Sequence, residues 1–209
     1  MSTRGEQQQR CKANFEAYMT GFVRIIGGQH RGRKLKVPDA AGVRPTPDRV
    51  RETLFNWLSP VIAGAHCLDV FAGSGVLGFE ALSRGATHVV MVDNDSRIVE
   101  LLQQESKIFN ITQAEIYTAQ APAALRRPNR PFDIVFLDPP YNTSLLLSTC
   151  AYLAAQAFLA EQAYIYLEAE RPIEDNELPL GWRLLKSQHA GQVYYHLVLA
   201  EKSYEHNKT

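Results

Sequence analysis

Two short stretches of the sequence carry residue types that could bind a nucleoside cofactor and hold an amino group beside it. In the first, residues 67–78, an apolar run ends in Asp69, a turn with Gly73 and Gly75 follows, and a helical apolar pattern comes next. Such a strand, turn and helix bring backbone N–H groups and a helix N-terminus to a ligand, and glycines leave room for its approach. Glycine spacing alone is weak evidence. The carboxylate at the strand end suits an amino or ammonium group better than a pyrophosphate, which favours S-adenosylmethionine over a dinucleotide.

The second stretch, residues 132–141, is a buried strand pattern that ends in Asp138, two prolines and Tyr141. The carboxyl end of a strand is where chemistry belongs in a doubly wound sheet. The Asp138 carboxylate and the Pro139 carbonyl can accept both N–H bonds of a planar amino group, and Tyr141 offers a stacking face. The alternative is a strand-terminating turn with a capping acid. Beside the glycine turn, the pattern indicates orientation of an amine for in-line displacement.

Further cofactor contacts are predicted around these stretches. A second predicted strand also ends in an acid, Asp93. The number of residues between the glycine turn and Asp93 is close to the spacing at which a carboxylate accepts the hydrogens of the ribose hydroxyl groups. Asp95 is its rival, although it could instead cap the helix that follows. Phe71 in the glycine turn and Gln120 after a weak strand at 114–118 are further candidates, Gln120 for the adenine amino group. A solvent-exposed loop glutamine remains open as the alternative.

Positive charge is concentrated at the front of the chain. Residues 1–51 hold eleven Lys and Arg against four Asp and Glu, whereas residues 52–209 hold eleven against eighteen. Residues 22–38 read as a β-hairpin with a glycine-containing turn. Its cations would share one small surface, and guanidinium groups suit phosphate oxygens. These predicted nucleic-acid contacts are Arg24, Arg31, Arg33, Lys34 and Lys36. A solvated charged surface is the alternative.

A helix is predicted to begin near Thr46, with Thr46 as N-cap and Pro47 in the first position. Its N-terminus is a candidate for a cofactor or substrate contact. Its apolar stripe should pack on the main domain, and its remaining polar residues should lie on the surface, with Arg49 available to RNA. The expected stripe is Val50, Leu54, Trp57 and Leu58, and the expected surface residues are Arg49, Arg51 and Asn56.

The length of 209 residues and a hydrophobic content of 45% allow one main domain with a small appendage. We expect a flexible arm at 1–20, a basic hairpin and helix at 21–60, a main domain at 61–202 and a tail at 203–209. Strands alternating with helices, closed by a hairpin over 182–200, predict an α/β fold with a mainly parallel sheet and an antiparallel edge. Cysteine and histidine spacings predict no metal site and no redox pair. No secretory or membrane-length apolar run is evident, so a reduced cytoplasmic protein is expected.

Several of these motifs together resemble one family. They are residues 24–28 (RIIGG), 44–46 (RPT), 48–56 (DRVRETLFN), 69–75 (DVFAGSG) and 138–141 (DPPY). The set closely resembles the bacterial small-subunit ribosomal RNA guanine-N2 methyltransferases of the RsmD family, over roughly residues 22–200. The resemblance implies a seven-stranded, Rossmann-like class I methyltransferase with S-adenosylmethionine as donor. It also implies a guanine of 16S rRNA, in the small subunit or its late precursor, as acceptor, and a monomeric enzyme.

The resemblance assigns roles residue by residue. Cofactor roles fall on Asp69, Gly73, Gly75 and Asp93, with Thr46 as a further contact, and residues 138–141 hold the base. Gln120 stands where such enzymes often have Asp or Asn, and Tyr141 replaces a common Phe.

Other functions stay open at this point. A DNA adenine-N6 or protein glutamine methyltransferase would use the same acid-Pro-Pro-aromatic loop, although the basic front end favours RNA. A noncatalytic ribosome-assembly factor that binds RNA is a third reading, which the intact 138–141 loop disfavours. A nicotinamide oxidoreductase is weaker still, because no hydride-transfer partner is evident.

Overall fold

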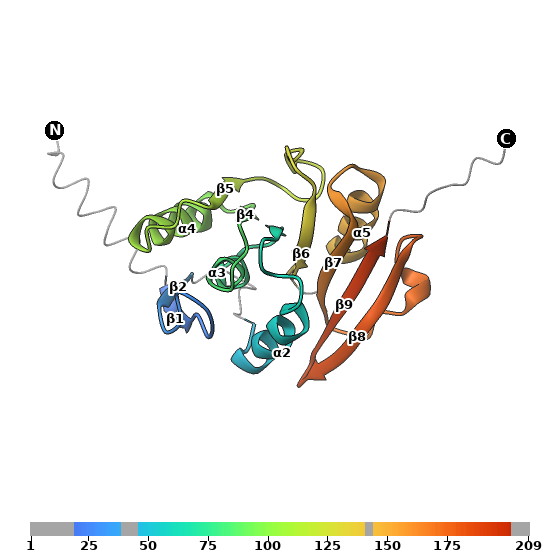
Figure 1. The fold of residues 1–209 in the computed structure, drawn as a ribbon, viewed down its shortest axis with the longest axis horizontal. Coiled ribbons are helices and arrows are strands. Elements are labelled where there is room, and N and C mark those ends of the chain that lie inside the picture. Colours follow the sequence, from blue (N-terminus) through green and yellow to red (C-terminus); the bar gives the residue numbers. More distant parts are fainter. Residues whose placement is uncertain (1–18, 39–45, 141–143, 202–209) are drawn as a thin grey trace, which may run out of the picture.

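The computed structural model describes residues 19–38, 46–140 and 144–201 of the chain. Within these ranges the strands form an antiparallel pair, β1–β2, and a seven-stranded sheet with the order β5-β4-β3-β6-β7-β9-β8 (Figure 1). The strands are β1 (Met19–Arg24), β2 (Lys34–Pro38), β3 (His66–Asp69), β4 (His88–Asp93), β5 (Ala114–Thr118), β6 (Phe132–Leu137), β7 (Leu159–Ala169), β8 (Trp182–Ala190) and β9 (Val193–Glu201).

Helices alternate with the strands of the large sheet. They are α2 (Asp48–Leu58), α3 (Val76–Ser83), α4 (Ser96–Ile108) and α5 (Leu145–Ala155), and a 3-10 turn, η1, covers Asp175–Glu177. Over the described ranges, none of the helices combines the length and apolar character that a membrane crossing needs.

The large sheet has the predicted mixed topology. Strands β3 to β7 pair in parallel, while β9 pairs antiparallel with both β7 and β8. From β3 the chain moves outward to β4 and β5, then returns to the other side of β3 with β6 and β7. The order therefore reverses between β3 and β6, and in open α/β sheets ligands bind outside the carboxyl ends of the strands at this point.

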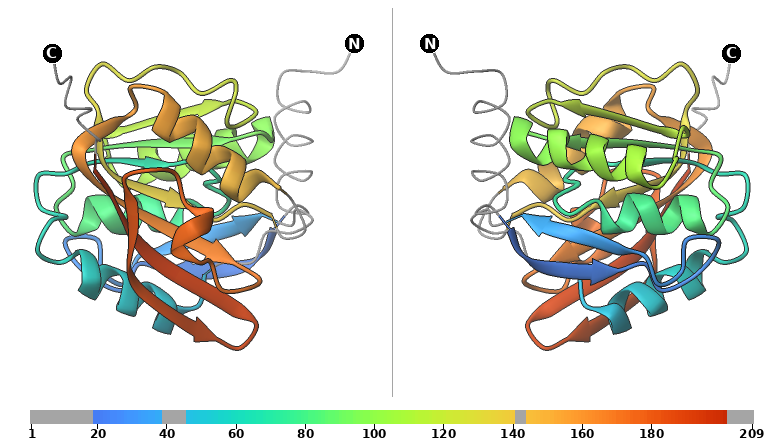
Figure 2. Two further views of the ribbon diagram at one scale, coloured as in Figure 1. Left: turned by 90° about the vertical axis from the view of Figure 1, so that its right-hand side faces the viewer. Right: turned by 90° about the vertical axis from the view of Figure 1, so that its left-hand side faces the viewer.

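Two apolar layers cover the faces of the sheet. On one face α2, α3, α4 and the β1–β2 hairpin share a core that includes Phe55, Phe79 and Phe136. On the opposite face α5 packs through Cys150 and Leu153 against the β6–β7 pair. Alternate residues of each strand enter the two cores, as the two-residue period of a strand requires. Figure 2 shows the hairpin beside α3 and α4, and Figure 1 shows α5 on the other side of the molecule.

The hairpin is a small sheet with one buried and one exposed face. Val23 and Leu35 are paired and buried, whereas Arg24 and Lys34 are paired and exposed. The predicted hairpin is therefore confirmed. Its first strand begins at Met19, two residues inside the segment expected to be an arm; the rest of that arm and the tail at 203–209 lie outside the described residues.

Two expectations for α2 are wrong. The N-cap is Pro47 and no side chain caps the helix, so Thr46 is not the cap. Thr46 is buried, and its hydroxyl donates to Asp138 instead of to the helix. Arg51, expected on the surface, is 0% exposed, because Glu80 of α3 supplies a buried partner. The predicted apolar stripe is buried, apart from the half-buried Trp57, which stacks on Tyr195.

Candidate functional site

The turn between β3 and α3 depends on two glycines with left-handed backbone. Gly73 has φ 51° and Gly75 has φ 72°, conformations that other residues rarely adopt. A Cβ on Gly75 would lie 2.4 Å from Cδ2 of Leu102, so packing also excludes a side chain there. The Gly75 N–H donates to the Ala72 carbonyl at 2.6 Å, and α3 begins at the next residue. The turn is thus tight, and its backbone conformation requires glycine at both positions.

Asp69 stabilises this turn from its buried side. Its carboxylate is buried, and Oδ2 accepts the backbone N–H of Gly78, in the first turn of α3, at 3.1 Å. Burial raises the pKa of Asp69 to about 7, against the effect of the Gly78 hydrogen bond. The acid therefore lies where the sequence placed it, at the tip of β3. Its contact with a cofactor amino or ammonium group stays a prediction.

Asp93, at the tip of β4, joins the same turn. Its Oδ2 accepts the Gly73 N–H at 3.0 Å and its Oδ1 accepts the Asp95 N–H at 2.9 Å. Asp95 is the N-cap of α4 and accepts the Arg97 N–H, so the capping alternative for Asp95 is confirmed. This leaves Asp93 as the ribose candidate beside the glycines. Phe71 is half-buried in the turn.

Gln120 lies just beyond β5 with an exposed side chain. Its adenine contact stays a prediction.

Asp138 lies one residue beyond β6, next to the glycine turn. The two strands pair through Asp69 and Phe136, and the Val70 N–H donates to the Phe136 carbonyl at 3.2 Å, so the tips of β3 and β6 adjoin. The Thr46 hydroxyl donates to Asp138 Oδ2 over a long 3.4 Å. Burial raises the pKa of Asp138 well above its usual range, and the nearby Glu168 and Asp69 carboxylates raise it further. Pro139 is buried, and Tyr141 lies outside the described residues.

A fourth acid at the strand tips, Glu168, was missed in the sequence. Leu137 of β6 pairs with Leu167 of β7, so Glu168 and Asp138 follow on neighbouring strands. Glu168 is buried and accepts the Tyr166 hydroxyl at 2.8 Å. The signal was available, because residues 163–168 (AYIYLE) form a β-prone run that also ends in an acid. Together with Asp69, Asp93 and Asp138, Glu168 makes four carboxyl groups at adjacent strand tips. A cationic ligand would favour their ionised forms.

The predicted nucleic-acid residues separate into two groups. Arg24 and Lys34 lie opposite each other on the exposed face of the hairpin, and Arg31 and Arg49 are exposed elsewhere. Arg33 instead reaches α4: its Nη1 donates to the Phe109 carbonyl at 3.1 Å, and its guanidinium lies 5.0 Å from the centre of the Phe109 ring.

The fifth cation, Lys36, is half-buried near Glu105. Burial raises the pKa of Glu105, and the charge of Lys36 offsets part of that rise. Arg33 and Lys36 thus also hold the hairpin onto the main domain.

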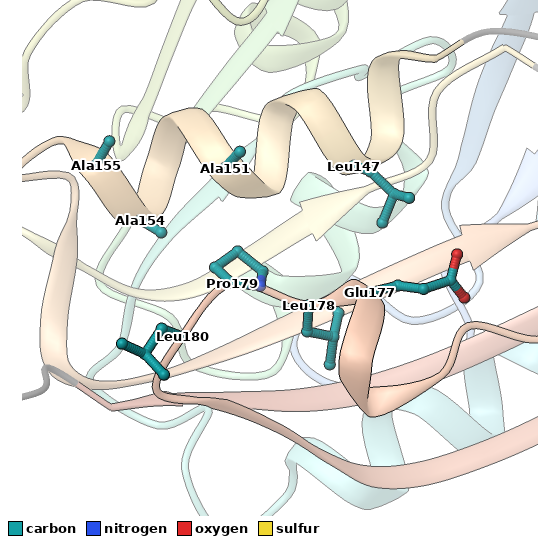
Figure 3. A pocket seen from close by; sticks show the side chains of 8 residues that line it. All are labelled: Leu147, Ala151, Ala154, Ala155, Glu177, Leu178, Pro179 and Leu180. Atoms are coloured by element: carbon teal, nitrogen blue, oxygen red, sulfur yellow. The ribbon is translucent and has the colours of Figure 1, made fainter.

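A shallow groove of about 420 Å³ lies elsewhere, between α5 and residues 177–180 (Figure 3). Small apolar side chains of α5 line one wall, and Leu178, Pro179 and Leu180 line the other. Its one carboxylate, Glu177, is paired with Arg171. None of the predicted site residues lines this groove.

The strand order reverses between β3 and β6, with a glycine turn after β3 and an acidic loop after β6. This arrangement defines the Rossmann-like fold of class I S-adenosylmethionine-dependent methyltransferases. The solved structure of yhhF from Escherichia coli shares it, with 44% identity, a TM-score of 0.79 and coverage of 88% of this chain and 100% of that one. The same fold occurs in the Thermus thermophilus 16S rRNA N2 G1207 methyltransferase, solved with AdoMet and guanosine. That protein is 23% identical, with a TM-score of 0.59, over 88% of this chain and 50% of that one.

Sequence comparison narrows this class to one family. The family described as "Conserved hypothetical protein 95" matches residues 23–199. Ribosomal RNA small subunit methyltransferase D of Escherichia coli K12 is 45% identical over 182 residues, which cover 87% of this chain and 92% of the relative. The Haemophilus influenzae protein of the same name is 45% identical over 183 residues, 85% and 93% of the two chains. The chain belongs to this RsmD family of ribosomal RNA methyltransferases.

Proposed function

We propose that this protein transfers a methyl group from S-adenosylmethionine to the N2 amine of a guanine in 16S rRNA, within the small ribosomal subunit or its late precursor. We further propose that it acts as a cytoplasmic monomer. The observation that carries the proposal is the adjacency of two strand tips, with the Gly73 turn after β3 and Asp138 after β6. Membership of the RsmD family and the basic hairpin support the choice of ribosomal RNA.

The donor would lie against the glycine turn. When bound, S-adenosylmethionine supplies an electrophilic methyl group on a sulfonium cation. Gly73 and Gly75 leave room for it, and Asp93 beside them can accept the ribose hydroxyls once its present N–H contacts are shared. Asp69, Phe71, Thr46 and Gln120 are the other proposed contacts. The negative strand tips favour a sulfonium over a neutral nucleoside.

The acceptor would lie against Asp138. The lone pair of the guanine amine is delocalised into the ring, so the amine is a poor nucleophile and must be oriented. Asp138 and the Pro139 carbonyl can accept its two N–H bonds and direct the lone pair toward the methyl group. As the new C–N bond formed, the bond from the methyl carbon to the sulfonium sulfur would break and leave neutral S-adenosylhomocysteine. Positive charge would then develop on the nitrogen, and one amine proton could pass to Asp138.

The electrostatic setting of Asp138 suits that transfer. Its raised pKa makes it a better proton acceptor than an exposed aspartate, while a bound sulfonium would favour its ionised form. Tyr141, beyond the described residues, is proposed to stack on the flipped base.

RNA would dock on the exposed face of the hairpin. Phe22 is 65% exposed there, beside the Arg24–Lys34 pair, with Lys34 Nζ 5.7 Å from the centre of its ring. Arg24 lies on the same face, two residues further along β1. An exposed ring among cations can stack on a base while its neighbours contact phosphates. Arg31, Arg33 and Arg49 are the remaining proposed contacts.

A nucleoside assay tests the proposal. Wild-type protein and Asp138→Ala are incubated with methyl-labelled donor and immature small subunits, and the RNA is digested to nucleosides. We expect N2-methylguanosine from wild type and little from the variant. Equal amounts from both would refute the role of Asp138. Methylated adenine in plasmid DNA or methylated glutamine in protein, with unmodified RNA, would favour those activities, and tight subunit binding without turnover would favour an assembly factor.

A further inference from the structure

A fully buried carboxylate joins the N-terminal segments to the main domain. Glu80 of α3 is 0% exposed, and its two oxygens accept four donors. The backbone N–H groups of Ile26 and Gly27, in the hairpin loop, each donate at 2.8 Å. Arg84 Nε donates at 2.8 Å and Arg51 Nη1 at 3.3 Å. One side chain therefore anchors both the hairpin and α2.

Arg51 continues this network toward the acceptor site. Its guanidinium is 0% exposed, and each of its nitrogens donates to a different oxygen. Nη1 reaches Glu80, Nη2 reaches Asp48 Oδ1 at 2.5 Å, and Nε reaches the Thr46 carbonyl at 3.1 Å. The planar fork of an arginine fits this geometry, and a lysine at the same position could not bond all three.

Thr46 connects Arg51 to Asp138. Its carbonyl accepts a hydrogen bond from Arg51, and its hydroxyl donates one to Asp138 Oδ2. We propose that Arg51 and Glu80 are positioning residues that hold the Thr46 hydroxyl against Asp138, so that this carboxylate presents its other oxygen to the acceptor amine. The inference rests on the proposed function to the extent that Asp138 receives the amine.

The network also tunes the acidity of Asp138. The hydrogen bond from Thr46 lowers the pKa of Asp138, against burial and against Glu168 of β7 and Asp69 of β3, which raise it. Among the described residues, Tyr166, also buried on β7, is the other titratable group that faces this carboxylate from a neighbouring strand. Loss of the Thr46 contact, directly or through Arg51, should therefore raise the pKa of Asp138 and move the acid limb of the pH–rate profile to higher pH.

Three variants test this chain of contacts: Thr46→Val, which removes the hydroxyl at nearly constant volume, Arg51→Lys, which keeps the charge but not the fork, and the double variant. Arg130→Lys is the matched control, because Arg130 is exposed, pairs with Asp133 and lies at the opposite end of β6. Thermal unfolding confirms that each variant is folded. We expect kcat to fall about tenfold in either single variant, the scale of one hydrogen bond to a charged group.

The double variant is the decisive comparison. Arg51→Lys should add little to the loss in a Thr46→Val background, and both single variants should move the acid limb upward while Arg130→Lys leaves it in place. Independent, multiplicative losses, or a slower Arg51→Lys enzyme with an unmoved acid limb, would overturn the inference. Carbon-13 NMR titration of the Asp138 carboxyl provides the same test without turnover. An inactive wild type would refute the proposed function, whereas an unchanged Asp138 titration in both variants would refute the positioning role alone.

Discussion

Replacing Gly75 with alanine should both destabilise the fold and weaken donor binding. The residue has φ 72°, and an added Cβ would meet Leu102 Cδ2 at 2.4 Å and Phe79 Cε2 at 2.9 Å. The left-handed conformation costs an L-residue about 1–2 kcal/mol. Overpacking adds about 1–3 kcal/mol. The total is a loss of about 2–5 kcal/mol in unfolding free energy.

Gly191, in the turn between β8 and β9, is a matched control. It has φ 63°, but an added Cβ would meet nothing within 4 Å. Gly191→Ala should therefore cost only the conformational share, about 1–2 kcal/mol. In a chain of this size each kcal/mol shifts Tm by about 2–4 °C, so the two variants should differ by about 2–12 °C.

Thermal unfolding and titration calorimetry with S-adenosylmethionine measure both effects. We expect Gly75→Ala to unfold at the lower temperature and to lose donor affinity, and Gly191→Ala to bind the donor as wild type does. Equal shifts in Tm would show that the packing around the glycine turn is not tight. Unchanged donor affinity in Gly75→Ala would remove the turn from the cofactor site.

Three other perturbations probe the buried charges and the RNA surface. Arg51→Met removes a buried partner of Glu80 and should lower the unfolding free energy by about 3–5 kcal/mol. The control Arg130→Met, at an exposed position, should lower it by less than about 1 kcal/mol. Similar urea midpoints for the two variants would contradict this. The pKa of Asp69 in the folded protein is raised to about 7. Its contribution to the unfolding free energy is therefore complete below pH 4 and is lost as pH rises through 7. Urea unfolding at a series of pH values should show the unfolding free energy of the wild type falling by up to about 4 kcal/mol between pH 4 and pH 8, and Asp69→Asn should lack this fall. An equal fall in wild type and variant would refute the assignment to Asp69. Replacing Arg24 and Lys34 by Gln should reduce the slope of log affinity for RNA against log salt by about 1 per residue, and binding curves that keep the wild-type slope would exclude phosphate contacts there.

Much of the site followed from local patterns. Residues 67–78 and 132–138 each contain a complete signal, an apolar strand, its terminating acid and a turn, within a dozen residues. Since parallel strands end at the same edge of a sheet, their acids were expected to gather there, and Asp69, Asp93 and Asp138 do so. The hairpin was predictable for the same reason, because its alternation and turn are local.

The errors concern contacts between distant segments. Arg51 was expected in solvent because charged residues are rarely buried without a partner, and that partner, Glu80, comes from another helix. A signal existed: Arg51 aligns with Phe55 and Leu58 on the buried side of α2, and Glu80 interrupts an otherwise apolar α3.

Thr46 was expected to cap α2, but Asp138, 92 residues away, takes its hydroxyl. Sequence spacing does not reveal an acceptor that lies so far along the chain, and helix ends are uncertain by one or two residues in any case.

Donor and acceptor are proposed to meet between the tips of β3 and β6. A crystal structure with S-adenosylhomocysteine and guanosine would show whether they do. We expect the thioether sulfur beside the Gly73 turn and the guanine N2 amine within hydrogen-bond distance of Asp138, facing that sulfur. Guanosine bound elsewhere, such as in the groove beside α5, or a sulfur too far from the amine for one methyl group to bridge, would contradict it.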